Sequence, residues 1–174
     1  MAQVGFIRNK NEIKYLILYI AERLIAPVSF EVMQELTMCD PAIEFFDFSE
    51  CIHYLVRTGH LTCSPDDLYA ITDKGVQNGR ACVDELPYAV RLTADKLTAA
   101  QNQKIKRARQ VQTKLAPRAN GTVSVMLRLN DDQGLPIWRM ELAVPDEAKA
   151  KALASRFEAQ PEQMYGELIK LLFP

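Results

Sequence analysis

Two cysteines and two histidines lie within thirteen consecutive positions, and they are the residues that most invite a search for metal chemistry. They are Cys51, His53, His60 and Cys63. Thiolates and imidazoles are the usual zinc ligands, and a structural zinc site takes four of them. Cys51 and His53 are two positions apart, about 200° around a helix, so they cannot face one metal ion. The spacing therefore predicts core or surface thiols and imidazoles, and no metal site.

Enzyme motifs are missing from the sequence. The chain has no Gly-rich phosphate loop and no Gly-x-Ser-x-Gly segment. Both histidines fall in one short stretch, so a Ser-His-Asp arrangement has little to draw on. Asp131 and Asp132 are adjacent in a polar, Gly-containing segment, which predicts a turn and not a catalytic carboxylate pair. We therefore expect no catalytic residue, no cofactor and no enzymatic activity.

The cysteines and an N-terminal apolar run bear on the cellular compartment. The run 15–21 is too short to cross a membrane and is followed by Glu22 and Arg23. It also lacks a small-residue cleavage site. The four cysteines form no close pair in the sequence, whereas disulfide frameworks usually place more cysteines in a shorter secreted chain. We expect reduced thiols in a cytoplasmic protein without a membrane partner.

Charge is spread unevenly along the 174 residues, although the formal net charge is only -1. Residues 1–90 carry 7 basic and 13 acidic side chains, residues 91–118 carry 8 and 1, and residues 119–174 carry 6 and 8. The densest basic positions are Lys104, Lys106, Arg107 and Arg109. These four are candidates for contacts with DNA phosphates, which make binding sensitive to salt. The alternative is a solvated face that pairs with acidic groups of the same chain or of a dimer partner.

Hydrophobic periodicity predicts a helical N-terminal segment. Apolar residues at helical spacing predict a first helix over residues 13–24, stopped by Pro27. Ser29 is expected to cap a second helix. A third helix is expected to begin at Asp47, with Glu50 as the partner residue of a capping box. Its buried stripe is expected to be Phe48, Cys51, Ile52 and Leu55.

A change of period after Gly59 predicts a short hairpin. Strands over residues 61–63 and 68–71 flank a polar turn. Thr72 is expected to cap a fourth helix that runs to about residue 85. Three helices followed by a hairpin is the order of a winged helix-turn-helix domain, which we expect over residues 1–86.

The rest of the chain predicts a connecting helix and a small C-terminal module. A basic linking or dimerisation helix is expected over residues 87–118, with its pattern running to about Leu115 and Leu92-Thr93 as the candidate interruption. The C-terminal module, residues 119–174, is expected to have a ββαα arrangement. Its expected strands are 123–129 and 137–144, and its expected helices are 145–157 and 161–172. The predicted fold class is α+β.

Trp138 lies on the second strand of this module and has two interpretations. A lone aromatic residue in an alternating strand is expected in the core. The alternative is a pocket or interface on one hairpin face that carries Met126, Trp138, Met140 and Leu142. A hairpin leaves its strand edges exposed, and a second copy would cover both an edge and an apolar face. We therefore expect a homodimer, in which the module dimerises or senses an effector.

Three segments, in order along the chain, resemble a known family. They read NEIKYLILYI at 11–20, LVRTGHL at 55–61 and LYAITDKG at 68–75. Together they resemble bacterial winged-helix proteins catalogued as domain of unknown function 4364, over most of the chain. The resemblance implies a transcriptional regulator with a winged-helix head. It also implies that Tyr69 and Ile71 pack the wing on the core, that Thr72 caps the next helix, and that Gly75 allows a close approach.

The exposed face of the third helix decides between two functions. Opposite its buried stripe lie the expected DNA-contacting residues Ser49, His53, Tyr54 and Arg57. Only Arg57 among them is always cationic, whereas DNA readers usually present Arg, Lys, Asn or Gln. Glu50 on this face, and Asp66 and Asp67 in the wing turn, repel phosphate. We predict a homodimeric regulator that binds double-stranded DNA; the alternative is a winged-helix protein–protein interaction module without strong DNA binding.

Overall fold

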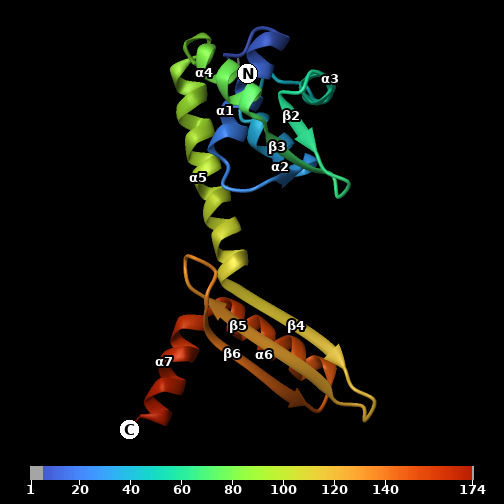
Figure 1. The fold of residues 1–174 in the computed structure, drawn as a ribbon, viewed down its shortest axis with the longest axis vertical. Coiled ribbons are helices and arrows are strands. Elements are labelled where there is room, and N and C mark those ends of the chain that lie inside the picture. Colours follow the sequence, from blue (N-terminus) through green and yellow to red (C-terminus); the bar gives the residue numbers. More distant parts are fainter. Residues whose placement is uncertain (1–5, 174) are drawn as a thin grey trace. The chain divides into compact units, whose positions relative to one another are not determined.

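The computed structural model describes residues 6–173, which form seven α-helices, one short 3₁₀ helix and two three-stranded antiparallel sheets (Figure 1). The chain divides into two compact units, Met1–Gln103 and Lys104–Pro174. Helix α5 (Tyr88–Gln110) begins in the first unit and ends in the second. The predicted α+β class is confirmed.

The first unit combines helices with a small sheet in which β3 lies between β1 and β2. Its elements are α1 (Lys10–Arg23), β1 (Val28–Ser29), α2 (Phe30–Thr37), α3 (Phe45–Arg57), β2 (Leu61–Cys63), β3 (Leu68–Ile71), α4 (Asp73–Ala81) and the 3₁₀ helix η1 (Val83–Glu85). The two hairpin strands have the predicted bounds. Strand β1 was missed because two residues are too short to show a period.

Side-chain caps fix the starts of three helices in this unit. Asn9 accepts hydrogen bonds from the backbone N–H groups of Asn11 and Glu12 at the start of α1. The hydroxyls of Ser29 and Thr72 do the same at the starts of α2 and α4, as predicted. Such caps satisfy N–H groups that have no partner within the helix, and each stabilises a helix by about 1 kcal/mol.

The core of the first unit lies between α1 and α3. Leu16, Ile17 and Ile20 of α1 are fully buried. The predicted stripe of α3 is also buried, and its members are Phe48, Cys51, Ile52 and Leu55. Burying each large apolar side chain contributes about 1.5–3 kcal/mol. This one-sided burial turns the other face of α3 outward.

The predicted start of α3 is wrong. The helix begins at Phe45, two residues before Asp47, and no side chain caps it. Phe45 packs edge-on against Phe30 of α2, with ring centroids 6.3 Å apart, and this tertiary contact extends the helix upstream of its polar start signal. Glu50 belongs to no capping box; its carboxylate accepts a hydrogen bond from Lys10 Nζ at 2.5 Å.

The second unit is a three-stranded sheet with two helices. After the end of α5 it contains β4 (Val111–Pro117), β5 (Val123–Asn130), β6 (Pro136–Val144), α6 (Glu147–Ala159) and α7 (Pro161–Leu172). The strand order follows the chain, so β5 is central. Helix α6 covers one face of the sheet, and the other face carries no helix of this unit (Figure 1).

The predicted end of the basic helix and the predicted ββαα module are both wrong. Helix α5 ends at Gln110, and residues 111–117 form strand β4 instead of further helix. Val111, Thr113 and Leu115 are half-buried and alternate with exposed residues, and the whole segment pairs with β5. This pairing over seven residues overrides the helical spacing of the apolar side chains. The helix is also continuous through Leu92-Thr93.

The face of this sheet that α6 covers forms the second core. Val125, Leu127 and Leu129 are buried there with Phe157 of α6. Trp138 packs edge-on against Phe157, with ring centroids 5.3 Å apart, as its predicted core position requires. The single apolar hairpin face predicted for Met126, Trp138, Met140 and Leu142 is wrong. Met126 is paired with Glu141, one position out of phase with the other three, and therefore lies on the opposite face.

Candidate nucleic-acid interface

The predicted recognition residues lie on the outer face of α3. His53, Tyr54 and Arg57 are exposed, and Ser49 is half-buried. The ring of His53 donates from Nδ1 to the Ser49 backbone carbonyl at 2.6 Å. The ring of Tyr54 lies close to two cations, with Lys14 Nζ at 4.6 Å and the Arg57 guanidinium carbon at 5.5 Å from its centroid. The structure therefore gathers two positive charges around an exposed aromatic residue.

Acidic groups lie on α3 itself and in the β2–β3 turn. Asp47 and Glu50 both contact Lys10 Nζ, at 3.2 and 2.5 Å. The hydrogen bond to Glu50, followed by the one to Asp47, raises the pKa of Lys10. This pairing neutralises part of the acidic charge beside α3. Asp66 and Asp67 in the β2–β3 turn are exposed, as predicted, and repel phosphate.

Two exposed phenylalanines at the start of α3 were missed by the sequence analysis. Phe46 is 80% exposed and Phe45 is 43% exposed. Their rings contact each other edge-on at 5.7 Å. The predicted start at Asp47 left this pair outside the helix, and two adjacent phenylalanines directly before a predicted helix were the signal that could have found it. Exposed aromatic residues of this kind are common where proteins bind one another.

The predicted basic positions at the end of α5 are not equivalent. Lys104, Lys106 and Arg109 are exposed and make no ion pair with a carboxylate of residues 6–173. Arg107 is paired with Glu162 of α7, and this hydrogen bond lowers the pKa of Glu162. The alternative of internal charge pairing therefore applies to Arg107, and three of the four cations remain available to a ligand.

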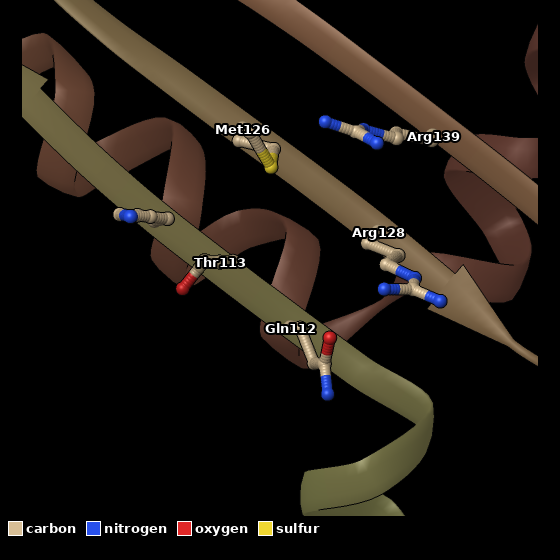
Figure 2. A pocket seen from close by; sticks show the side chains of 6 residues that line it. Gln112, Thr113, Met126, Arg128 and Arg139 are labelled. Atoms are coloured by element: carbon tan, nitrogen blue, oxygen red, sulfur yellow. The ribbon is translucent and has the colours of Figure 1, made fainter. Parts of the chain in front are cut away.

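A second group of cations, which was not predicted from the sequence, lies on the uncovered face of the β4–β5–β6 sheet. Arg128 of β5 is directly opposite Arg139 of β6, and Lys114 of β4 is opposite Met126. These side chains line an open hollow of about 430 Å³ together with Gln112 and Thr113 (Figure 2). The period-two alternation of β5 was the available signal, because it turns Arg128 away from the apolar core.

A family model described as Domain of unknown function (DUF4364) matches residues 13–172. The chain belongs to this family. The comparisons with curated proteins and with solved structures found no match.

Metal ligands, membrane-spanning helices and cysteines were the other features considered for this DUF4364 protein. Within residues 6–173, no three His, Cys, Asp or Glu side chains are grouped in a way that could hold a metal ion. None of the described helices combines the length and the apolar character needed to cross a membrane. Cys39, Cys51, Cys63 and Cys82 are free thiols, and burial raises the pKa of the Cys39 thiol to about 11.

Proposed function

We propose that residues 10–85 form a winged helix-turn-helix domain. The order α1–β1–α2–α3–β2–β3 supports this assignment, with α2 and α3 adjacent in the chain and the β2–β3 hairpin following α3 directly. Strand β1 completes the sheet by pairing with β3. In such a domain α3 takes the position of the recognition helix, and the hairpin takes the position of the wing.

On this basis the protein is a non-enzymatic, DNA-binding transcriptional regulator. The observation that carries the proposal is the outer face of α3, which is exposed and presents Tyr54 beside Lys14 and Arg57. This face would enter the major groove, where Arg57 has the donors to read base edges. Lys104, Lys106 and Arg109 would contact phosphates, because they are exposed and form no ion pair with a described carboxylate.

The regulator is proposed to act as a homodimer in the cytoplasm. Leu171, Leu172 and Phe173 at the end of α7 are between 60% and 81% exposed, which is unusual for a lone helix terminus. β4 and β6 are the two edges of their sheet, and both can pair with a second copy. The free thiols are consistent with a reducing compartment.

A protein–protein interaction module is the second candidate, and one observation favours it. Phe45 and Phe46 form an exposed aromatic pair at the N-terminal end of the same helix. The exposed carboxylates of Asp66 and Asp67 in the β2–β3 turn weaken attraction to DNA but suit a partner that carries basic groups. The two candidates therefore use different ends of α3, and mutations can separate them.

The test is a selection of duplexes from a random-sequence pool, followed by fluorescence anisotropy with the selected duplex and a scrambled one. The full-length protein is expected to prefer the selected duplex. Arg57→Gln is expected to reduce this preference about fivefold or more, because a bidentate contact to a base discriminates by about 1–3 kcal/mol. Sedimentation of the same samples measures the dimer, and Leu171→Glu is expected to dissociate it.

Phe46→Ala is the matched variant, because it changes the same helix without changing charge. It is expected to leave the duplex preference intact. Wild-type protein that shows no preference among duplexes contradicts the regulator. A loss of duplex binding in Phe46→Ala equal to that in Arg57→Gln contradicts reading by the Tyr54–Arg57 end of the helix.

A further inference from the structure

The uncovered face of the second sheet places two arginines side by side. Arg128 and Arg139 are direct cross-strand partners, and side chains at such positions lie about 5 Å apart at their Cβ atoms. Figure 2 shows both on neighbouring strands, near Met126. Lys114 is a diagonal neighbour of Arg128 on the third strand. Like charges directly opposite each other destabilise a sheet, so this arrangement costs folding free energy.

The three cations form no ion pair within the described chain. Neither Lys114, Arg128 nor Arg139 lies within ion-pairing distance of a carboxylate in the described chain. The acidic residue on this face is Glu141, which accepts a hydrogen bond from the Ser124 hydroxyl and lies 3.5 Å from Arg118. The hydrogen bond from Ser124, followed by the charges of Arg118 and Arg139, lowers the pKa of Glu141, so this one carboxylate offsets the three cations only in part.

One of the three is held in place by a buried side chain. Arg128 donates from Nε to Asn130 Oδ1 at 2.7 Å, and Asn130 in turn donates from Nδ2 to the Arg109 backbone carbonyl at 2.8 Å. Asn130 is only 5% exposed, so its amide is fixed. This relay uses the inner nitrogen of Arg128 and leaves the two outer nitrogens to bind an anion in the bidentate manner typical of phosphate.

The shape of the face favours a polymer over a small ligand. Small-molecule sites enclose their ligand in a largely apolar cavity, whereas Lys114 and Arg139 are exposed here. Strand β4 follows α5 without a loop, so the exposed Lys104, Lys106 and Arg109 lie in the segment leading into this sheet. A chain of phosphates can contact both groups of cations, because it repeats its charge along its length.

The side chains of the open face favour duplex over single-stranded nucleic acid. The paired residues on this face are Gln112, Lys114, Ala116, Ser124, Met126, Arg128, Asn130 with its partner Pro136, Arg139, Glu141 and Ala143. None of them is aromatic, whereas proteins that hold single strands stack bases on aromatic rings. The face can therefore bind a phosphate backbone but offers no surface on which to stack a base.

We infer that the open face of the β4–β5–β6 sheet, through Lys114, Arg128 and Arg139, binds the phosphodiester backbone of double-stranded DNA. This inference rests on the proposed function, because both require the protein to bind duplex DNA. It adds a second contact surface in the other compact unit, independent of α3. The sheet face supplies attraction that does not depend on sequence, whereas α3 supplies the sequence preference.

The experiment measures anisotropy of a labelled duplex of about 30 base pairs and arbitrary sequence, at about 50 to 200 mM salt. The triple variant Lys114→Gln/Arg128→Gln/Arg139→Gln is compared with the full-length wild type. Each phosphate contact contributes about 0.9 to the slope of log K against log salt, so the triple variant is expected to lose about 2.7 of that slope. Arg139→Gln alone is expected to lose about 0.9.

The matched control is Lys151→Gln/Arg156→Gln/Lys170→Gln, which removes the same charge from exposed positions on α6 and α7. It is expected to keep the wild-type slope. Arg128→Lys/Arg139→Lys is also expected to keep it, because both charges remain. Circular dichroism confirms that each variant is folded, and the single Arg139→Gln variant carries the test if the triple variant is not.

The outcomes separate this inference from the proposed function. If the sheet triple variant keeps the wild-type slope of log K against log salt, the inference is overturned. The proposed function stands in that case if the sequence preference still depends on Arg57. If the sheet triple variant loses the salt slope and the preference for the selected duplex does not depend on Arg57, the inference is supported and base reading by α3 is contradicted. Wild-type protein that binds no duplex at about 50 mM salt overturns both. Calorimetric binding of pyrophosphate at the three cations, with duplex binding unaffected by their loss, overturns the inference in favour of a small anion.

Discussion

The two compact units of this DUF4364 protein differ in charge and in what they expose. Met1–Gln103 carries 9 basic and 14 acidic side chains, whereas Lys104–Pro174 carries 12 basic and 8 acidic ones. The first unit exposes aromatic residues on α3 beside acidic groups. The second exposes a sheet face with cations in adjacent rows. A net charge near zero for the whole chain therefore conceals two surfaces of different chemistry.

Under the proposed function, this difference gives the two units separate roles in DNA binding. A unit with excess negative charge is repelled by a duplex at long range, and salt screens that repulsion only beyond about 8–10 Å. A unit with excess positive charge attracts the duplex without regard to sequence. The proposed regulator would then obtain its affinity from the second unit and its sequence preference from the few cations around Tyr54.

The largest expected effect tests whether the two units are separate folding units. Phe157 is fully buried in the second core, and replacing it with alanine is expected to cost about 3–5 kcal/mol of unfolding free energy. Trp138 is the single tryptophan of the chain and packs on Phe157. Its fluorescence during urea unfolding therefore reports on the second unit.

The control is the reciprocal variant in the first core. Phe48→Ala is expected to reduce amide-exchange protection in α1 and α3 and to leave the Trp138 transition in place, because Phe48 lies in the other unit. A Phe157→Ala variant that lowers protection in α1 and α3 as much as in β5 would show one cooperative unit. The two units would then unfold together and would not differ in stability.

Smaller effects are expected when one glycine of each unit is replaced by alanine, and the two changes in stability have opposite signs. A Cβ atom on Gly75 would lie 2.2 Å from the His60 carbonyl oxygen and 2.8 Å from Ile71 Cγ1. Gly75→Ala is therefore expected to destabilise the first unit by about 1–3 kcal/mol. Gly166 in α7 has no atom within 4 Å of such a Cβ, so Gly166→Ala is expected to stabilise the second unit by about 0.5–1 kcal/mol. Urea unfolding of both variants measures the two changes, and equal signs would contradict the close approach at Gly75.

Local signals in the sequence predicted much of the first unit. Caps at Ser29 and Thr72 and the hairpin strands on either side of residues 64–67 were predicted correctly, because each depends on a few adjacent residues. The start of α3 was not, because Phe45 joins the helix through contact with Phe30, fifteen positions away. That error also hid Phe46, which the prediction had left outside the helix.

The second unit was harder to predict because pairing between strands decides it. Residues 111–117 have apolar spacing compatible with a helix, and only their pairing with β5 makes them a strand. The meeting of Arg128 with Arg139 depends on the register of β5 and β6, which includes an irregularity at Leu129/Asn130. A shift of one residue would turn each of these side chains to the other face, so the sequence alone could not place the cations together.

The smallest expected effect links the stability of the sheet to its binding. Arg139→Gln removes one of two like charges that face each other across β5 and β6, and it is expected to stabilise the second unit by about 0.2–1 kcal/mol at low salt. Arg139→Lys keeps the charge and is expected to change little. Urea unfolding followed through Trp138 measures both, and the gain is expected to shrink at high salt because the repulsion is screened. If Arg139→Gln is no more stable than the wild type at low salt, repulsion between the two arginines does not exceed the attraction of Arg139 to Glu141, and the pair then needs no external anion to compensate it. Arg139→Gln can instead be more stable and have a duplex affinity that depends less on salt. The charge of Arg139 then weakens the fold and strengthens binding, which is the pattern expected of a ligand-binding surface.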